Sequence, residues 1–431
     1  MTLKVFTAFS GYDSQCMALD RLHRQTPDFN YELVGWAEID KYAIAAHNAV
    51  YPQWAERNYG DIAKIDWAQV PDFDLFTYSS PCQDFSQAGK QAGGTEGSGT
   101  RSSLLWECRR AILAKKPKYL LMENVAALVS QKFIRLFNAW QLELESYGYR
   151  NFAKVLNAKD YGVPQNRERI FMVSVLDEQA RYEFPDPMPL PLRLKDVLEP
   201  KVDERYYIPE KTLKTVLKRV KSQRTLIDGM RDGTAAALTA KSHVTCCTNV
   251  VLEPLIGAFR GRNPENPSER ARSNGRYKQL LEINENGWSN TLTGVQKDNV
   301  VLEPLPIHTD QDGNALCISA RYSKESWEKI MVGKDYKLTA ILVPQNSEDE
   351  QNERLSVIEI EGNLYRIRKL TERECFRLMD VPEEYIDRIQ AAGISRSQQY
   401  KMAGNSIVVS CMYHIWRKLW IDTEIKTITL F

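Results

Sequence analysis

One stretch of this sequence determines its fold and its chemistry: Phe73-Asp74-Leu75-Phe76-Thr77-Tyr78-Ser79-Ser80-Pro81-Cys82-Gln83. Its apolar, aromatic first half predicts a buried strand, and the Pro-Cys-Gln triplet predicts an abrupt turn at the carboxyl end of that strand. A glycine-rich loop follows, with Gly89, Gly93, Gly94, Gly97 and Gly99. A thiol before such a loop suits a cysteine nucleophile with a closing lid, but a lone free cysteine is more often a small buried hydrophobe. On its own, the stretch favours the buried cysteine.

Strand-like and helix-like segments alternate around this stretch, over residues 1–175. The strand candidates are Leu3–Phe9, Tyr31–Ala37, Phe73–Tyr78, Tyr119–Met122, Phe152–Leu156 and Ile170–Val175. The helix candidates are Gln15–His23, Lys41–Val50, Ser102–Leu113 and Phe133–Ser146. This alternation predicts an α/β fold with helices on both faces of the sheet, in which ligands bind beyond the carboxyl ends of the strands.

Polar residues stand just beyond the predicted strands. Gly11 follows the first strand and precedes a helix, where the backbone can approach a ligand closely. Glu38 follows the second strand, where a carboxylate suits ribose hydroxyls, and Asp61 offers a second carboxylate that could accept from an adenine amino group. Each signal alone is weak, because such carboxylates are usually turn residues or helix caps. Together they predict a site for a nucleoside-containing cofactor.

Two further motifs could carry chemistry. Glu123 opens Glu123-Asn124-Val125 at the end of an apolar strand, where burial would raise the carboxyl pKa and suit a group that donates or shares a proton. Arg167 and Arg169 occupy alternate positions where the strand Ile170–Val175 begins, so both could reach one anionic or polar target. A surface salt-bridge ladder with Glu168 explains the two arginines equally well.

The motifs form an ordered set that carries a resemblance. They are Phe9-Ser10-Gly11, Glu38, Asp61, Pro81-Cys82-Gln83, Glu123-Asn124-Val125, Gln165-Asn166-Arg167-Glu168-Arg169 and Gly404-Asn405-Ser406. In this order the set resembles the DNA (cytosine-5)-methyltransferase family. The resemblance implies an α/β, Rossmann-like S-adenosylmethionine-dependent methyltransferase sheet with a smaller, β-rich target-recognition domain. It implies a catalytic and cofactor-binding domain over 1–184, a target-recognition region over 185–364, and a C-terminal segment over 365–431 that returns to the catalytic domain.

The resemblance also assigns catalytic roles, and it makes Cys82 a nucleophile rather than a core residue. By resemblance, Cys82 adds to C6 of a cytosine that is flipped out of the DNA duplex. Glu123 is then expected near N3 and the exocyclic amine, and Arg167 and Arg169 near O2 and the phosphate backbone. The loop 86–101 becomes the lid over the flipped base.

The implied cofactor is S-adenosyl-L-methionine, with S-adenosyl-L-homocysteine as its product. Its residues are expected to be Phe9 and Gly11 (methionine part), Glu38 (ribose), Ile39 and Ile62 (adenine ring), Asp61 (adenine amino group), Pro81 and Leu104 (cleft wall), and Asn405 and Ser406 (from the C-terminal segment). One departure stands out, because the family's further glycines are replaced by Tyr12-Asp13-Ser14. Asp or Ser can cap the following helix, and Asp tolerates unusual φ angles better than most residues.

The middle of the chain departs from the α/β alternation. Prolines 185, 187, 189, 191 and 200 mark a linker, and the basic segment 211–224 suits either phosphate contacts or a solvated helix face. The heptapeptide Asn249–Leu255 recurs as Asn299–Leu305, which suggests duplicated hairpins in a target-recognition region. A loop between the copies is the candidate for sequence readout, since arginine suits guanine edges and phosphates. Its arginines are Arg260, Arg262, Arg270, Arg272 and Arg276.

Composition limits compartment and partners. The eight cysteines form no CxxC pair and no metal-spaced set with histidine, so we expect reduced thiols and no metal site. No apolar run is long enough to span a bilayer and the start lacks a signal-peptide pattern, which predicts a cytoplasmic protein, bacterial or phage-encoded by resemblance, with no membrane partner. The net charge of +1 neither demands nor forbids nucleic acid. Double-stranded DNA is the expected partner of a monomer, with a cognate restriction endonuclease as a further candidate.

Two other functions remain open at this point. A tRNA cytosine-5 methyltransferase would share the fold, although the long middle region is what that relative lacks. A catalytically silent DNA-binding paralogue would be expected to have lost the nucleophile or the glutamate, and both Cys82 and Glu123 are present. We therefore expect an active DNA cytosine-5 methyltransferase.

Overall fold

The structure is a computed structural model that describes residues 2–80, 104–190, 192, 194–207 and 363–422, together with short strands between 255 and 360. The chain divides into two compact units. Unit 1 comprises Met1–Val197, Trp288–Val295 and Glu372–Phe431, and unit 2 comprises Leu198–Gly287 and Gln296–Thr371. Each unit is described by itself below.

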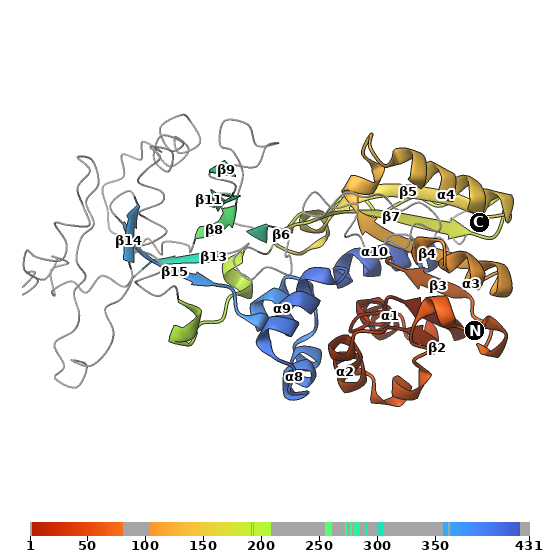
Figure 1. Cartoon of the computed structure of the whole chain (residues 1–431), viewed down its shortest axis with the longest axis horizontal. Helices are drawn as coiled ribbons and strands as arrows, with labels where there is room; N and C mark the ends of the chain where they lie inside the picture. The colour runs from red at the N-terminus through yellow and green to blue at the C-terminus, as the bar shows by residue number, and fades with distance from the viewer. Residues whose placement is uncertain are drawn as a thin grey trace, which may run out of the picture. The chain divides into compact units, whose positions relative to one another are not determined.

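Unit 1 is built on a six-stranded sheet with the order β2-β1-β3-β4-β7-β5 (Figure 1). The strands are β1 Thr2–Ala8, β2 Asn30–Ala37, β3 Leu75–Tyr78, β4 Tyr119–Val125, β5 Arg150–Asn157 and β7 Glu168–Val175. The first four in the order are parallel, whereas β7 runs antiparallel to both β4 and β5. The expected α/β class is confirmed. The reversal of β7 was not predicted, because an apolar run has the same composition in either direction.

Four helices follow the first strands along the chain. They are α1 Ser14–Gln25, α2 Lys41–Val50, α3 Cys108–Lys115 and α4 Ile134–Ser146. The helix α4 buries Phe137, Trp140 and Leu144, which recur at helical spacing along one face. The predicted helix 102–113 is shorter than expected at its start, because α3 begins at Cys108 and residues 101–103 lie outside the described part of the chain.

An aromatic core holds β3 in place. Phe6, Trp67, Phe73 and Phe76 pack with ring centroids 5.2–6.4 Å apart. Buried aromatic rings of this kind contribute about 0.5–1.5 kcal/mol per pair beyond the area that they bury. One of the tryptophans in this core, Trp140 of α4, donates a hydrogen bond to the hydroxyl of Tyr78, 3.1 Å away. The strand that leads to Pro81-Cys82 is therefore anchored through Phe76 and Tyr78, which lie on the same face of β3 and stack on each other.

The C-terminal part of unit 1 forms four helices, α7 Glu372–Arg377, α8 Glu383–Ala391, α9 Arg396–Asn405 and α10 Val409–Trp420. The last helix, α10, packs beside α1 although nearly the whole chain separates them in sequence (Figure 1). The motif Gly404-Asn405-Ser406 does not open this final helix. These residues end α9, because Ser406 is extended (φ −85°, ψ 170°) and buried, β-branched Ile407 and Val408 delay the next helix to Val409.

Unit 2 contains a five-stranded antiparallel sheet with the order β11-β8-β13-β15-β14. Its strands are β8 Leu255–Arg260, β11 Leu280–Asn284, β13 Val300–Pro304, β14 Val357–Ile360 and β15 Asn363–Lys369. The second copy of the repeated heptapeptide supplies β13, which pairs with β8, the strand that starts at the last residue of the first copy. Arg272 and Arg276 lie on a short antiparallel pair, β9 Arg272–Ser273 and β10 Arg276–Tyr277, rather than in an open loop. Arg262, Arg270 and the basic segment 211–224 lie outside the described residues.

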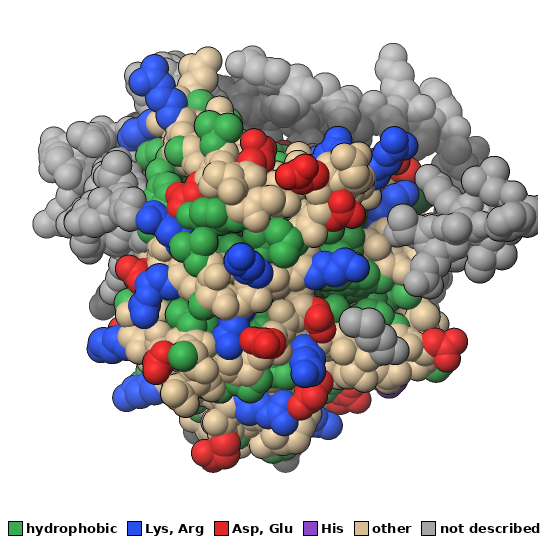
Figure 2. Space-filling model, turned by 90° about the vertical axis from the view of Figure 1, so that its right-hand side faces the viewer, with side chains coloured by type: hydrophobic (Ala, Val, Ile, Leu, Met, Phe, Trp, Pro, Cys, Tyr) green, Lys and Arg blue, Asp and Glu red, His purple; other side chains and the backbone are tan. Residues whose placement is uncertain are grey.

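Among the described residues, no helix is long and apolar enough to cross a membrane. The same part of the chain holds no group of three His, Cys, Asp or Glu residues arranged to bind a metal ion. On the face drawn in Figure 2, basic and acidic side chains are interspersed with hydrophobic ones. This mixture agrees with the net charge of +1.

Candidate active site

The carboxyl ends of β1 and β2 meet in a small polar loop. The backbone N–H of Gly11 donates to Glu38 Oε2 at 3.0 Å, and Glu38 Oε1 accepts from the backbone of Ile39 (2.7 Å) and Asp40 (2.9 Å). Phe9 and Gly11 have left-handed backbones, with φ of 56° and 59°. We call this region, with Asn58 and Asp61, the donor end, because the residues expected to bind the methyl donor lie here. Its predicted residues Phe9, Gly11 and Glu38 are therefore neighbours.

Asn58 is a residue that the sequence interpretation missed. Its side-chain oxygen accepts from the N–H of Glu38 (3.2 Å) and of Gly60 (2.9 Å), and its amide nitrogen donates to the carbonyl of Glu38 (3.2 Å). It thereby joins the loop after β2 to Gly60-Asp61. Its position two residues before a glycine was the available signal, because Asn side chains commonly bond to backbone two residues on.

The two carboxylates and the two isoleucines of the donor end differ in their surroundings. Asp61 caps a short helical turn by accepting from the N–H of Ala63 (3.1 Å), and lies 3.4 Å from Lys64 Nζ. The side chain of Ile39 is 70% exposed, whereas that of Ile62 is 4% exposed and belongs to the core cluster around Phe6. Only Ile39 presents a free apolar surface.

The C-terminal segment reaches the donor end through Ser406. Its hydroxyl donates to the hydroxyl of Ser14 at 3.1 Å, which joins α1 to the connection between α9 and α10. Asn405, the other predicted residue of this segment, ends α9 with an exposed side chain. The tripeptide that replaces the family's glycines is thus in direct contact with a residue almost four hundred positions away.

A buried acid lies at the carboxyl end of β4. Glu123 is 8% exposed, and Arg169 Nε lies 3.2 Å from its Oε1. Burial raises the pKa of Glu123, while the positive charges of Arg169 and Arg167 act to lower it. The carboxyl group is therefore one that can hold a proton nearer to neutral pH than an exposed glutamate can. We call Glu123, Arg167 and Arg169 the base end.

The two arginines have different partners. Arg167, between β6 (Gln165–Asn166) and β7, is 3% exposed and donates through one terminal nitrogen to the carbonyls of Gly404 (3.0 Å) and Ser406 (2.6 Å). Arg169 instead contacts Glu123. These contacts do not form the surface salt-bridge ladder with Glu168 that was the alternative explanation for the two arginines. Arg167 fastens the C-terminal segment, a role that spacing along a strand could not indicate.

Asn124 connects Glu123 to the stretch 73–83, which contains Cys82. Its amide nitrogen donates to the carbonyl of Ser80 at 3.1 Å, and both residues are buried. Ser80 is the residue immediately before Pro81-Cys82-Gln83. The predicted residues Pro81 and Cys82 and the lid 86–101 lie outside the described residues. Leu104 follows the lid and is partly buried against the core cluster.

Comparisons with known proteins agree on one family. The family model for C-5 cytosine-specific DNA methylase matches residues 3–420. The type II methyltransferase M2.ScrFI of Lactococcus lactis is 38% identical over 257 residues, which cover 48% of this chain and 70% of that protein. The orphan methyltransferase M.SPRI of Bacillus phage SPR is 29% identical over 454 residues, covering 97% of both chains.

Solved structures show the same fold at low identity. The methyltransferase EhMeth of Entamoeba histolytica has a TM-score of 0.57 at 15% identity, over 98% of this chain and 99% of that one. The Dnmt2 methyltransferase of Schizosaccharomyces pombe gives 0.54, also at 15% identity, over 98% and 99%. At this identity the likeness concerns the fold alone.

The sheet has a methyltransferase fold, and the donor end and the base end form a polar site at the carboxyl ends of its strands. The chain belongs to the C-5 cytosine-specific DNA methylase family. It is a DNA cytosine-5 methyltransferase, as expected from its motifs, and its reaction is the methylation of cytosine in DNA. The tRNA alternative is not favoured by these relatives.

Proposed function

We propose that the chain transfers a methyl group from S-adenosylmethionine to C5 of a flipped cytosine in duplex DNA, with Cys82 as the nucleophile. The observation that carries this proposal is the hydrogen bond from Asn124 to Ser80. It ties the residue beside the buried acid Glu123 to the chain that leads directly to Cys82. Covalent activation of a cytosine ring requires an acid and a thiol near one another, so the proposal expects Cys82 to lie near Glu123.

The donor end suits S-adenosylmethionine. A Cβ added at Gly11 or Gly60 would meet no atom within 4 Å, so there is open space beside both backbones. The exposed Ile39 offers an apolar surface for an adenine ring, and the carboxylates of Glu38 and Asp61 offer acceptors for ribose hydroxyls and an amino group. Bound there, S-adenosylmethionine would supply an electrophilic methyl group. Phe9, Ser406, Asn405, Pro81 and Leu104 complete the proposed pocket.

The base end activates the cytosine. C5 of cytosine is a poor nucleophile, so the Cys82 thiolate first adds to C6 and converts the C5–C6 double bond into an adduct with enamine character at C5. Glu123 holds N3 and the exocyclic amine and stabilises the charge that develops there, and Arg169 contacts O2. After C5 has taken the methyl group, the C5 proton leaves to a base and the thiolate departs, which restores the double bond.

Arg167 has a different role in this proposal from the one expected by resemblance. Its guanidinium is buried and bonded to the carbonyls of Gly404 and Ser406. We therefore propose that it positions the C-terminal segment, and that its charge helps to set the pKa of Glu123, on which it acts at a distance.

Recognition of DNA belongs to the remaining parts of the chain. The target base must leave the duplex to reach a buried acid. The loop 86–101 would close over it, and the region 185–364, with its arginines around β8, β9 and β10, would read the sequence. We propose a monomer acting in the cytoplasm of a bacterium, with a cognate restriction endonuclease as a partner if the gene belongs to a restriction-modification pair.

Transfer of tritium from labelled S-adenosylmethionine tests this function. Purified chain is incubated with duplex DNA and, separately, with tRNA, and incorporation is measured in each. The proposal predicts label in DNA alone. Label in tRNA alone would favour the rejected alternative, and no label in either with folded protein would favour a silent paralogue.

A further inference from the structure

The loop that follows β1 is strained, and something must hold it. Phe9, Gly11 and Asp13 all have left-handed backbones, with φ of 56°, 59° and 66°. A non-glycine residue is disfavoured in this conformation, because its Cβ comes too close to the following carbonyl oxygen. Strain of this kind persists only where the surroundings determine it, and it concentrates where ligands bind. Asp13 is one of the residues that replaces the family's usual glycines, so its surroundings are the place to look.

The carboxylate of Asp13 is fully buried and gathers several contacts. Its Oδ1 accepts from the N–H of Cys16 at 3.1 Å, which caps α1. Its Oδ2 accepts from the hydroxyl of Thr7 at 3.0 Å and lies 3.4 Å from Nε2 of His47. Neither the Asp13 nor the His47 side chain has any exposed surface. A buried carboxylate without compensating partners would be strongly destabilising, so these contacts are needed.

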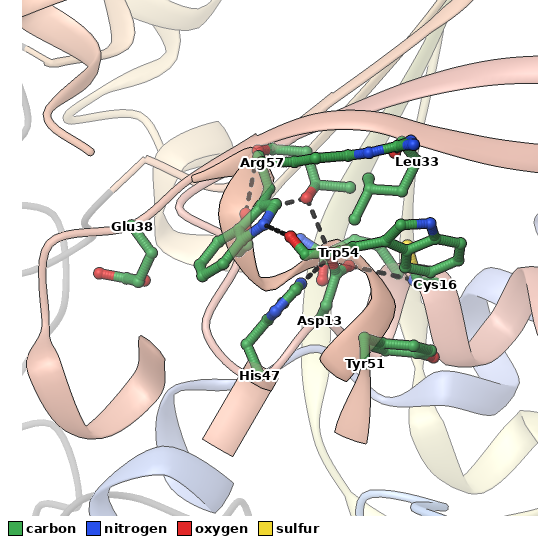
Figure 3. A network of polar contacts seen from close by, with 12 residues as sticks. Asp13, Cys16, Leu33, Glu38, His47, Tyr51, Trp54 and Arg57 are labelled. Atoms are coloured by element: carbon green, nitrogen blue, oxygen red, sulfur yellow. Dashed lines mark hydrogen bonds and ion pairs between the residues drawn. The ribbon is translucent and has the colours of Figure 1, made fainter. Parts of the chain in front are cut away.

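His47 is directed at this carboxylate and at little else that is polar. Figure 3 shows His47 of α2 pointing toward Asp13 at the start of α1. Its ring stacks on that of Trp36, with centroids 3.7 Å apart and planes 18° apart. Among the described residues, neither ring nitrogen has a hydrogen-bond partner within the usual limits. Within the part of the chain that the structure describes, Asp13 is the acidic side chain in ion-pair range of His47.

The position of His47 couples it to the donor end from a second direction. The helix that carries it, α2, begins immediately after Asp40, whose side chain caps the helix, and Asp40 in turn donates its N–H to Glu38. Glu38 accepts from Gly11. Glu38, two residues before the N-cap of α2, and His47, in the last turn of that helix, therefore both contact the segment between β1 and α1.

We propose that His47 is a positioning residue for the methyl donor. Through Asp13 it holds the left-handed loop Phe9–Asp13 and the facing Glu38 in the conformation that binds the methyl donor. The contact between His47 and Asp13 thus stabilises a backbone conformation that glycine residues would adopt without strain. It does not touch the reacting atoms. The inference rests on the proposed function in that S-adenosylmethionine is taken as the donor.

The test measures donor affinity in the full chain. Calorimetric titration with S-adenosylmethionine, and with S-adenosylhomocysteine, is compared between wild type and His47→Gln, Asp13→Gly and the double variant. Glycine accepts the left-handed φ of position 13 and removes the carboxylate, together with its cap on α1. We expect His47→Gln to raise the donor Kd about tenfold, with kcat at saturating donor and the KM for DNA unchanged. In the Asp13→Gly background, the same substitution should add nothing, since coupled residues are not additive.

A matched substitution provides the control. His414→Gln replaces a partly buried histidine of α10 that contacts the rings of Tyr161 and Tyr413, away from the donor end. It should leave the donor Kd at the wild-type value. If His47→Gln does not fold, Asp13→Asn carries the same measurement, because asparagine also tolerates the left-handed region.

Each outcome decides the inference. A wild-type Kd in His47→Gln, even with a lowered melting temperature, overturns it and leaves a purely structural histidine. Full additivity in the double variant also overturns it. If the wild type binds neither S-adenosylmethionine nor S-adenosylhomocysteine, the proposed donor itself fails and the inference fails with it, which the wild-type titration alone reveals.

Discussion

The donor end and the base end lie at the same edge of one sheet, but they depend differently on the C-terminal segment. The loops of the donor end are bonded to one another at short range, and the C-terminal segment joins them through the bond between Ser406 and Ser14, whereas a residue of the base end is itself bonded to that segment. At the donor end, Gly11 and Glu38 are 27 positions apart in sequence. At the base end, Arg167 bonds to Gly404 and Ser406, which are 237 and 239 positions away. Short separations cost little loop-closure entropy, whereas the base end can form only after the C-terminal segment has returned.

This difference predicts how the two ends respond to substitution. A change at the donor end should alter the affinity for the donor and leave the rest of the site intact. A change at the base end should alter either the chemical step or the stability of the whole unit, because its arginine also fastens the C-terminal segment. The predictions below separate these effects, from the largest to the smallest.

Cys82→Ser should abolish methyl transfer and leave DNA binding unchanged. A serine hydroxyl is far more weakly ionised than a thiol and cannot replace the thiolate as nucleophile. Tritium incorporation and electrophoretic mobility shifts on the same duplex measure the two properties. Retained turnover would refute the assignment of Cys82 as the nucleophile, and with it the proposed covalent activation of the cytosine.

Glu123→Gln should lower kcat by about 10²–10⁴-fold, the usual contribution of a positioned acid or base. The KM for the donor should not change, because Glu123 lies at the base end. Steady-state kinetics with varied S-adenosylmethionine measures both. Glu168→Gln, which removes an exposed carboxylate on the neighbouring strand β7, is the matched control. A kcat within a factor of about three of wild type would rule out the role given to Glu123.

Arg167→Met should destabilise unit 1 by about 2–4 kcal/mol, because the buried carbonyl of Gly404 and the partly buried carbonyl of Ser406 lose their donor. Urea denaturation measures the free energy of unfolding. The control is Arg135→Met on the exposed face of α4, which should change stability by less than about 0.5 kcal/mol. Equal stability of the two variants would mean that Arg167 does not fasten the C-terminal segment.

Asn124→Ala should cost about 1 kcal/mol through the lost bond to Ser80 and should also lower kcat. The comparison is Asn151→Ala, which loses a similar 3.0 Å bond to the carbonyl of Gln141, remote from the site. Both variants should lose similar stability, and only Asn124→Ala should lose rate. If both or neither lose rate, the bond to Ser80 does not position the nucleophile.

The smallest expected effect is a shift in pH dependence. Catalysis that needs protonated Glu123 falls as the pH rises through its pKa, which burial raises and Arg169 lowers. Removing the cation in Arg169→Gln should raise that pKa further, so the alkaline limb of kcat should move to higher pH. Arg169→Lys keeps the charge and should keep the limb in place. A shift to lower pH in Arg169→Gln would contradict this electrostatic account.

The sequence predicted much of the sheet, because strands and helices of unit 1 have strong local patterns. The predicted helix Lys41–Val50 has the bounds of α2, and the strands around Phe76 and Met122 pair as parallel neighbours. The direction of β7 and the break between α9 and α10 were not predicted, since both depend on tertiary packing. Local hydrophobicity carries no information about strand direction.

The candidate site was only partly predictable for the same reason. Motif resemblance indicated Glu38 and Glu123, which lie where strands end. It could not indicate that Arg167 bonds to Gly404, or that His47 faces Asp13, because a motif does not show which distant segment its residues contact. Buried polar partners are fixed by the fold and are readable only once the fold is known.

Mass analysis of nucleosides tests the central claim most directly. The chain and its Cys82→Ser variant are expressed in a bacterial strain without cytosine-5 methylation of its own, and DNA and RNA are hydrolysed separately. The account predicts 5-methyl-2′-deoxycytidine in DNA from the wild-type culture alone, with RNA unchanged. Methylation at N4 of cytosine or N6 of adenine, 5-methylcytidine confined to RNA, or equal product from the variant would contradict it.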